Sequence, residues 1–166
     1  MTGTINFGSS SYYVDKNGVA KFSKCYGAVY NDYAEFFPRG EDTEPGDIIA
    51  LDENNKEEKY IKATNKSKIV VGIHSNEYAM IIGGDAVEFG EDYISKNIKK
   101  YIPVGLCGRV YVKVIGNVDI GDYIIPSDIP GVGKSSKEYS NLSVGRVIES
   151  SNSNSIHKVR IIIGKE

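Results

Sequence analysis

The clearest alternation of apolar and polar positions lies between Pro103 and Ile115, in the segment PVGLCGRVYVKVI. Val110, Val112 and Val114 alternate there with Arg, Tyr and Lys. Because successive side chains of a β-strand point to opposite faces, the three valines would share one buried face. This pattern predicts the strongest strand of the chain.

Shorter apolar segments, separated by polar loops, predict further strands. One region differs, because Tyr93, Ile94, Ile98 and Tyr101 are at near-helical spacing within residues 91–102 and fit either a short helix or an extended arm. The whole pattern predicts an all-β fold, a barrel or sandwich-like domain with at most one short helix. The expected strands are residues 48–51, 60–63, 69–75, 79–82, one within 117–136, 144–150 and 157–166.

Residues 5–25 predict a β-hairpin at the N-terminus. Strand-forming residues flank Asp15-Lys16-Asn17-Gly18, and Asn-Gly supplies the positive φ angles that a tight turn needs. A lone hairpin is marginally stable in water, so it must pack on the following domain or on identical chains. We therefore expect two parts, a hairpin with a junction strand in residues 1–37 and a β-barrel-like domain in residues 38–166.

Two parts of the chain resemble each other, which predicts an internal duplication. PGDIIALD followed by VVGIHS is echoed later by IGDYIIPSD followed by SVGRVIES. In each, a Gly-Asp turn leads into an apolar strand, and Val-Gly begins a strand that returns beside it. Two such units can close on each other and bury both apolar faces. Since Gly-Asp is a common turn, chance similarity is the alternative.

Composition narrows the classes of partner. A chain of 166 residues can bury one sizeable core. It carries 20 basic and 22 acidic residues, so it lacks the basic excess that is typical of nucleic-acid-binding proteins. No stretch approaches the roughly 20 apolar residues that span a bilayer, and the first residues have neither the basic nor the apolar region of a signal peptide. We expect no nucleic-acid partner, no membrane partner and no cleaved signal.

The two cysteines, Cys25 and Cys107, are too few and too far apart for a metal site or a disulfide framework. Cys107 lies among apolar residues in the strongest predicted strand, and we expect its thiol to be buried and unreactive. The glycine-rich segments lack the spacing of a phosphate-binding loop. The sequence therefore predicts neither a cofactor nor a metal.

Two acids, Asp32 and Glu35, lie among aromatic residues in Tyr26–Phe37, YGAVYNDYAEFF. Amide hydrolysis can use a carboxylate pair, in which one acid protonates the leaving nitrogen and the other activates water. On a strand, residues i and i+3 point to opposite faces. If the segment is extended, the two acids can work together only when a second chain supplies one of them. The alternative is that both are solvent-side or hydrogen-bonded acids between core aromatics.

His74 and Ser75, with Glu77 nearby, contain the residue types of a base and a nucleophile. Adjacent residues of a strand point in opposite directions, so the two cannot bond each other as a catalytic dyad does. We interpret them as the polar end of a strand.

The segment INFGSSSYYVDKNGVAKFSKCYGAVYNDYAEFF, together with EPGD, GRVYVKV and GDYIIPSDIPG, resembles the C-terminal region of bacteriophage and prophage tail or tailspike proteins. The resemblance covers nearly the whole chain, and YGAVYNDYAEFF is its strongest signature. It implies a β-rich, homotrimeric domain at the end of a longer fibrous protein of the virion tail, made in the bacterial cytoplasm. A subset of these regions is the intramolecular chaperone domain of phage neck-appendage spikes, which trimerises, guides folding and then cuts itself off.

Carried over to this chain, the resemblance implies that Asp32 and Glu35 are the catalytic pair of a glutamic-type peptidase and that the bond between Asn31 and Asp32 is cut. The family has Ser before the Asp, whereas this chain has Asn31. Three hypotheses follow. The chain is a structural domain that promotes trimer assembly, a self-cleaving chaperone, or a module that binds a host surface glycan or protein.

Overall fold

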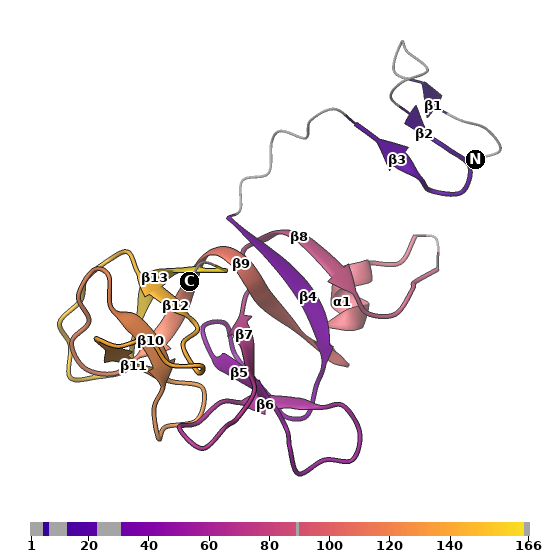
Figure 1. Ribbon diagram of the computed structural model, residues 1–166. Coiled ribbons are helices and arrows are strands. Elements are labelled where there is room, and N and C mark those ends of the chain that lie inside the picture. The colour runs from indigo at the N-terminus through magenta and orange to yellow at the C-terminus, as the bar shows by residue number, and fades with distance from the viewer. Residues whose placement is uncertain (1–4, 7–12, 23–30, 89, 165–166) are drawn as a thin grey trace.

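The computed structural model describes residues 5–6, 13–22, 31–88 and 90–164, and almost every regular element in it is a strand (Figure 1). The predicted all-β fold is confirmed. The one described helix, α1 (Tyr93–Asn97), begins after Asp92, whose carboxylate accepts hydrogen bonds from the N–H groups of Ile94 and Ser95. The strands are β1 (Ile5–Asn6), β2 (Tyr13–Val14), β3 (Ala20–Lys21), β4 (Asp32–Pro38), β5 (Ile48–Leu51), β6 (Tyr60–Lys62), β7 (Val70–His74), β8 (Tyr78–Gly83), β9 (Tyr101–Val114), β10 (Tyr123–Pro126), β11 (Gly133–Ser136), β12 (Gly145–Val147) and β13 (His157–Ile163).

The three N-terminal strands form a small antiparallel sheet in the order β1-β2-β3. The predicted turn connects β2 and β3, and Gly18 has a φ of +82°. The carboxylate of Asp15 accepts hydrogen bonds from the N–H groups of Asn17 and Val19, both at 2.9 Å. The hairpin around this turn is therefore confirmed, while residues 7–12 and 23–25 of the predicted hairpin lie outside the described residues.

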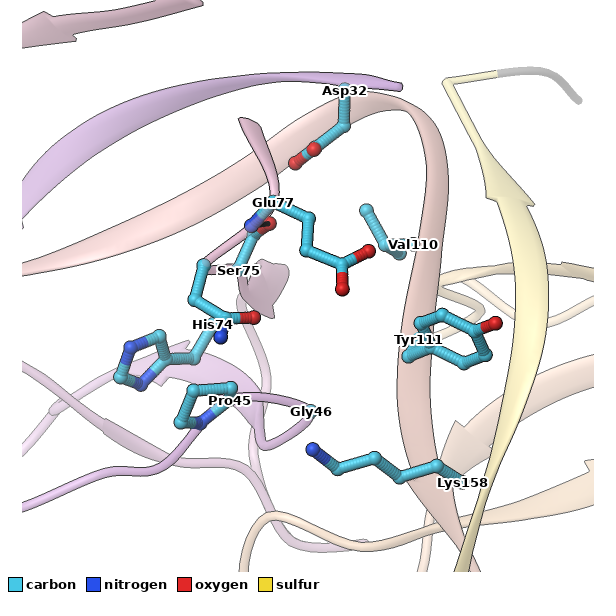
Figure 2. A pocket seen from close by; sticks show the side chains of 10 residues that line it. Asp32, Pro45, Gly46, His74, Ser75, Glu77, Val110, Tyr111 and Lys158 are labelled. Carbon is cyan, nitrogen blue, oxygen red and sulfur yellow. Dashed lines mark hydrogen bonds between the residues drawn. The ribbon is translucent and has the colours of Figure 1, made fainter. Parts of the chain in front are cut away.

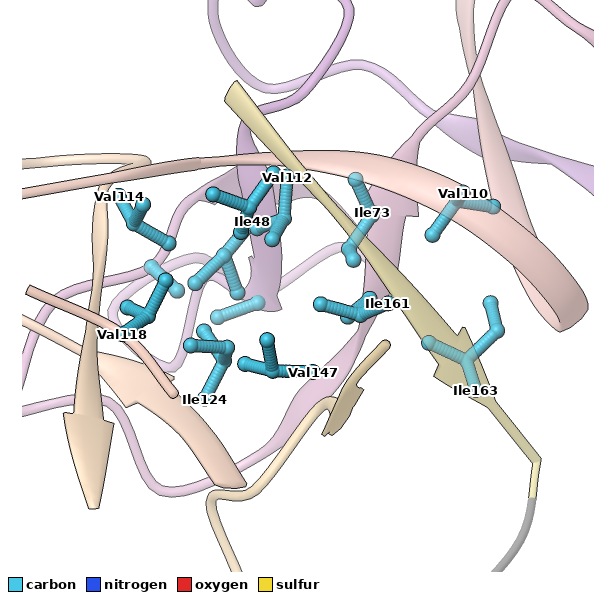
Figure 3. Packing of buried hydrophobic residues seen from close by; sticks show 13 residues of the cluster. Ile48, Ile73, Val110, Val112, Val114, Val118, Ile124, Val147, Ile161 and Ile163 are labelled. Carbon is cyan, nitrogen blue, oxygen red and sulfur yellow. The ribbon is translucent and has the colours of Figure 1, made fainter. Parts of the chain in front are cut away.

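Five strands close a barrel in the order β11-β10-β12-β13-β9, and a parallel contact between Gly133 of β11 and Val114 of β9 completes the circle. The apolar face of β9 lines the core, with Val110, Val112 and Val114 all buried as their alternation predicts. Figure 3 shows these valines facing the isoleucines and valines of β10, β12 and β13. The strongest predicted strand is thus the wall of the barrel.

The N-terminal half of β9 lies in a second part of the same sheet, where its neighbours are β4 and β7. The sheet continues from β7 to β5 and β6, and β8 pairs with β4 in parallel. Strands β5, β6 and β9 contribute a second apolar cluster to this part of the sheet, formed by Ile49, Tyr60, Ile102 and Val104. The 14 residues of β9 therefore connect the barrel to the region around β4.

The structure supports the predicted duplication, because β5 and β10 occupy equivalent positions in the two similar segments. Strand β5 pairs with β6 and β7, and β10 pairs with β11 and β12, all antiparallel. In each copy the Gly N–H donates to a carbonyl of the returning strand, and the N–H of that strand residue donates to the carbonyl of the Asp. The bonds are Gly46 to His74 (2.8 Å), His74 to Asp47 (2.8 Å), Gly121 to Val147 (2.9 Å) and Val147 to Asp122 (2.8 Å).

Candidate functional site

Asp32 is the first residue of β4, and it is paired with Tyr78 of β8 and Gly108 of β9. Asp32 is 1% exposed, and neither carboxylate oxygen has a hydrogen-bond partner within the described part of the chain. A buried carboxylate without a partner costs free energy of folding. Asp32 is therefore a candidate for chemistry rather than for stabilisation.

Two glycines of β9 provide the space for Asp32 and for the residue before it. A Cβ at Gly105 would lie 2.6 Å from Oδ2 of Asp32, and a Cβ at Gly108 would collide with the backbone carbonyl of Asn31. Gly108 also has a φ of +114°, which side-chain-bearing residues rarely adopt. Close approach of β4 to β9 at this point therefore depends on glycine at both positions.

Burial raises the pKa of the Asp32 carboxyl above its ordinary value of 3.8. The nearby hydroxyl of Ser75 and the N–H of Asp32 itself act in the other direction, while the negative charge of Glu77 raises the pKa further. A carboxyl with a raised pKa holds its proton closer to neutral pH, as a general acid must.

Glu35 lies on the other face of β4. Asp32, Ala34 and Phe36 are buried, whereas Glu35 is half-exposed. Phe37, two residues after Glu35 and so on the same face of β4, packs edge-on against Tyr60 with ring centroids 4.7 Å apart, which places Glu35 on the Tyr60 side of the sheet. The charge of Glu35 also contributes, after burial and Glu58, to the raised pKa of Tyr60, about 12. Within one chain, Asp32 and Glu35 therefore do not face each other, as the periodicity of a strand predicts.

A pocket of about 120 Å³ opens beside Asp32 (Figure 2). Figure 2 shows the side chains of Asp32 and Glu77 directed into it. The sequence alone did not connect Glu77, Tyr111 or Lys158 with Asp32, because the three lie far from it along the chain. Glu77 is in the connection between β7 and β8, Tyr111 is on β9 and Lys158 is on β13. The lining residues are Asp32, Pro45, Gly46, His74, Ser75, Asn76, Glu77, Val110, Tyr111 and Lys158.

Arg109 holds Asn31 at two points, next to the Asn31–Asp32 bond. Its backbone N–H donates to the carbonyl oxygen of Asn31 at 3.2 Å, and its guanidinium donates to the side-chain oxygen Oδ1 of Asn31. A hydrogen bond to a carbonyl oxygen draws charge from the carbonyl carbon and favours attack on it. The carbonyl that precedes Asp32 is therefore both fixed and polarised.

His74 and Ser75 lie at the end of β7 as predicted, and both are buried. The two residues do not bond each other: His74 Nδ1 shares a hydrogen bond of 2.9 Å with the hydroxyl of Thr43, and Ser75 Oγ accepts one from the N–H of Glu77 at 3.2 Å. Burial lowers the pKa of His74 to about 4, and the nearby charge of Arg39 acts in the same direction. His74 is therefore neutral at pH 7.

The prediction that Cys107 is buried is wrong, since its side chain is exposed. The pairing of β4 with β9 is irregular between Tyr33 and Ala34, and there β9 contains one additional residue. This bulge interrupts the alternation and leaves Cys107 opposite the exposed Tyr33. Cys25 lies outside the described residues.

In the part of the chain that the structure covers, no group of three or more His, Cys, Asp or Glu side chains could hold a metal ion. No described helix has the length and hydropathy to span a bilayer.

Comparison of the sequence with protein-family models finds no match. Comparison with curated proteins finds none either.

Two solved structures share the fold of this chain. Pre-mature gene product 12 of bacteriophage phi29 superposes with a TM-score of 0.66 and 18% identity, over 93% of this chain and 24% of that protein. The C-terminal fragment of the same gene product superposes with a TM-score of 0.56 and 17% identity, over 80% of this chain and 99% of the fragment. This chain thus spans about a quarter of the pre-mature protein and nearly the whole of its C-terminal fragment.

Proposed function

We propose that this chain is the C-terminal domain of a phage tail appendage or tail-fibre protein and that it promotes assembly of that protein as a homotrimer. The observation that carries the proposal is the superposition on nearly the whole C-terminal fragment of the phi29 gene product, a phage protein. The partners of the chain are then its own copies and the rest of the tail protein, and its place is the virion tail.

An apolar surface on β4 and β8 supports the trimer. Tyr33, Met80 and Ile82 are each more than half exposed. In the parallel pairing Tyr33 lies beside Met80 and Glu35 beside Ile82, so these side chains share one face. We call this set of three residues the β4–β8 patch. A second copy of the chain would remove the patch from water, which is the usual source of free energy for association.

Sedimentation velocity tests the assembly role directly. The chain at micromolar concentration should sediment as a trimer, because the patch has no cover within the described part of one chain. A monomer at the highest concentration tested would contradict the proposal.

We further propose that the domain cuts its own chain between Asn31 and Asp32. The observations that favour this are the buried carboxyl of Asp32, which has no hydrogen-bond partner among the described residues, and the hydrogen bond from the N–H of Arg109 to the Asn31 carbonyl. Water adds to the carbonyl carbon of Asn31, the C–N bond breaks, and the nitrogen of Asp32 receives a proton. The products are a new carboxylate at Asn31 and a new amino group at Asp32.

The length of the matching fragment supports this position of the cut. The C-terminal fragment of the phi29 protein covers 80% of this chain, whereas the pre-mature protein covers 93%. Residues 32–166 are 135 of the 166 residues, or 81%. A cut at this bond would therefore release a piece of the same size as the superposed fragment.

Intact mass spectrometry tests the cut. On incubation the unmodified chain should give two products, residues 1–31 and 32–166, whereas Asp32→Asn should keep its full mass. Asn has nearly the shape of Asp but cannot donate the proton. Glu57→Gln, in the exposed loop between β5 and β6, is the control and should be cut like the unmodified chain. Persistence of full-length chain in the unmodified protein would contradict self-cleavage.

A further inference from the structure

A two-carboxylate mechanism needs a second acid beside Asp32. The resemblance assigns this role to Glu35, but Glu35 is on the opposite face of β4 and could reach an Asp32 only in another chain. The structure brings a different acid to Asp32 within the same chain.

Glu77 is that acid. It lies between the end of β7 and the start of β8, and the next residue, Tyr78, is paired with Asp32. The N–H of Glu77 donates to Ser75 Oγ at 3.2 Å, which fixes the connection beside the pocket. The side chains of Glu77 and Asp32 both line the pocket and are directed into it (Figure 2).

We infer that Glu77, from the same chain as Asp32, is the second catalytic acid of the self-cleavage proposed above. Its carboxylate takes a proton from a water molecule in the pocket as the water oxygen bonds to the Asn31 carbonyl carbon. The carboxyl of Asp32 gives its proton to the leaving nitrogen as the C–N bond breaks. The balance is one water consumed, with one proton accepted by Glu77 and one released by Asp32.

Three features of the site suit these roles. The pocket of about 120 Å³ has room for water molecules. Burial keeps the pKa of Asp32 raised, and the charge of Glu77 raises it further, so the two carboxyls differ in environment as an acid and a base must. The hydrogen bond from Arg109 supports the oxygen on which negative charge develops.

Replacement of Glu77 tests the inference. Glu77→Gln should slow the cut by at least about 100-fold, the usual contribution of a general base. Glu77→Asp keeps a carboxylate and should retain measurable cleavage, while Glu57→Gln should cleave at the unmodified rate. Circular dichroism and sedimentation should be unchanged in all three. Cleavage of Glu77→Gln at the unmodified rate would overturn the inference, and an uncut unmodified chain would overturn self-cleavage itself.

Mixed oligomers determine whether the two acids belong to one chain. Asp32→Asn and Glu77→Gln chains are unfolded together, refolded as mixed trimers and incubated. No site then contains both acids from one chain, so we expect no cut. Cleavage of the mixture would show that the second acid acts across chains and would overturn the inference. Glu35→Gln alone tests the role of Glu35. It keeps Asp32 and Glu77 in one chain and should be cut at the unmodified rate, whereas an uncut Glu35→Gln trimer would assign the second acid to Glu35 of a neighbour and would overturn the inference.

A readout that is independent of cleavage uses the charge of Glu77. Carboxyl carbon NMR of the uncut chain, recorded before incubation, should show a lower pKa for Asp32 in Glu77→Gln than in the unmodified protein, and Glu57→Gln should show no change. The masses of the two products should sum to the intact mass plus one water. A sum without water would exclude the water activation assigned to Glu77.

Discussion

At the scale of single residues, burial displaces the pKa values of Asp32 and His74 in opposite directions. Burial disfavours the charged form of either group, so it raises the pKa of the carboxyl and lowers that of the imidazole. For Asp32, the contribution to stability is fully present below pH 3.8 and is lost as the pH rises through the raised value. For His74, stability is present above pH 6.5 and is lost as the pH falls towards 4.

We predict that acidification from pH 6.5 to 4 destabilises the fold through His74. The pKa of about 4 in the folded state, against 6.5 when unfolded, corresponds to roughly 3 kcal/mol at the acidic end of this range. In His74→Asn, which cannot take up the proton, that part of the pH dependence of the unfolding free energy should disappear. Urea unfolding at several pH values measures it, and His157→Asn, at the half-exposed start of β13, is the control. Equal pH dependence in His74→Asn and the unmodified chain would contradict the prediction.

At the scale of elements, the two Gly-Asp turns use the same design in different surroundings. In each, the Asp carboxylate accepts a hydrogen bond from the N–H three residues earlier and pairs with a lysine. Asp47 and Lys113 are 2.8 Å apart, and the Lys113 side chain is only 19% exposed. Lys137, the partner of Asp122 at 2.9 Å, is 69% exposed.

We predict that the first turn depends more on its Asp than the second. Among the described residues, Asp47→Ala leaves Lys113 with Glu44 alone as an acidic partner in a partly buried site, and it should cost about 3 kcal/mol of unfolding free energy. Asp122→Ala loses a more exposed pair together with the same backbone hydrogen bond and should cost about 1 kcal/mol. Urea unfolding at pH 7 compares the two variants directly. Equal losses would show that the two turns are energetically equivalent despite the difference in burial.

Local patterns predicted the elements well where each element buries one face. The alternation of Val110, Val112 and Val114 predicted the barrel strand, and Asn17-Gly18 predicted the hairpin turn. The same rule failed at Cys107, because a bulge depends on the partner strand and has no signal in the sequence of β9. Helical spacing in residues 91–102 indicated α1 but not its end, because Tyr101 already belongs to β9.

The part of the candidate site that lies on β4 was predictable, because it also follows from a local pattern in the sequence. Asp32 was a candidate from its place among aromatic residues, the family resemblance pointed to the bond before it, and period-two alternation placed Glu35 on the other face. Glu77 was recognised only as a neighbour of His74 and Ser75. Its approach to Asp32 depends on the parallel pairing of β4 with β8, which joins segments about 45 residues apart and follows from the fold as a whole.

At the scale of the whole molecule, the β4–β8 patch sets the expected oligomeric state. We predict that Ile82→Lys shifts the chain from trimer to monomer, because a charge would have to be buried in the interface. Ile120→Lys, which changes an exposed isoleucine next to the second Gly-Asp turn, should leave the trimer intact. Sedimentation velocity with circular dichroism of both variants checks this. A trimeric Ile82→Lys variant would place the interface elsewhere.

Strand β9 is hydrogen-bonded to both parts of the fold, the region around β4 and β7 and the barrel. It pairs with β4 and β7 on one side of the molecule and with β11 and β13 in the barrel. Neither half can open without removing hydrogen bonds from this one strand. Duplicated units joined by a linker could melt in two steps, whereas units that share a strand must lose their structure in one cooperative transition.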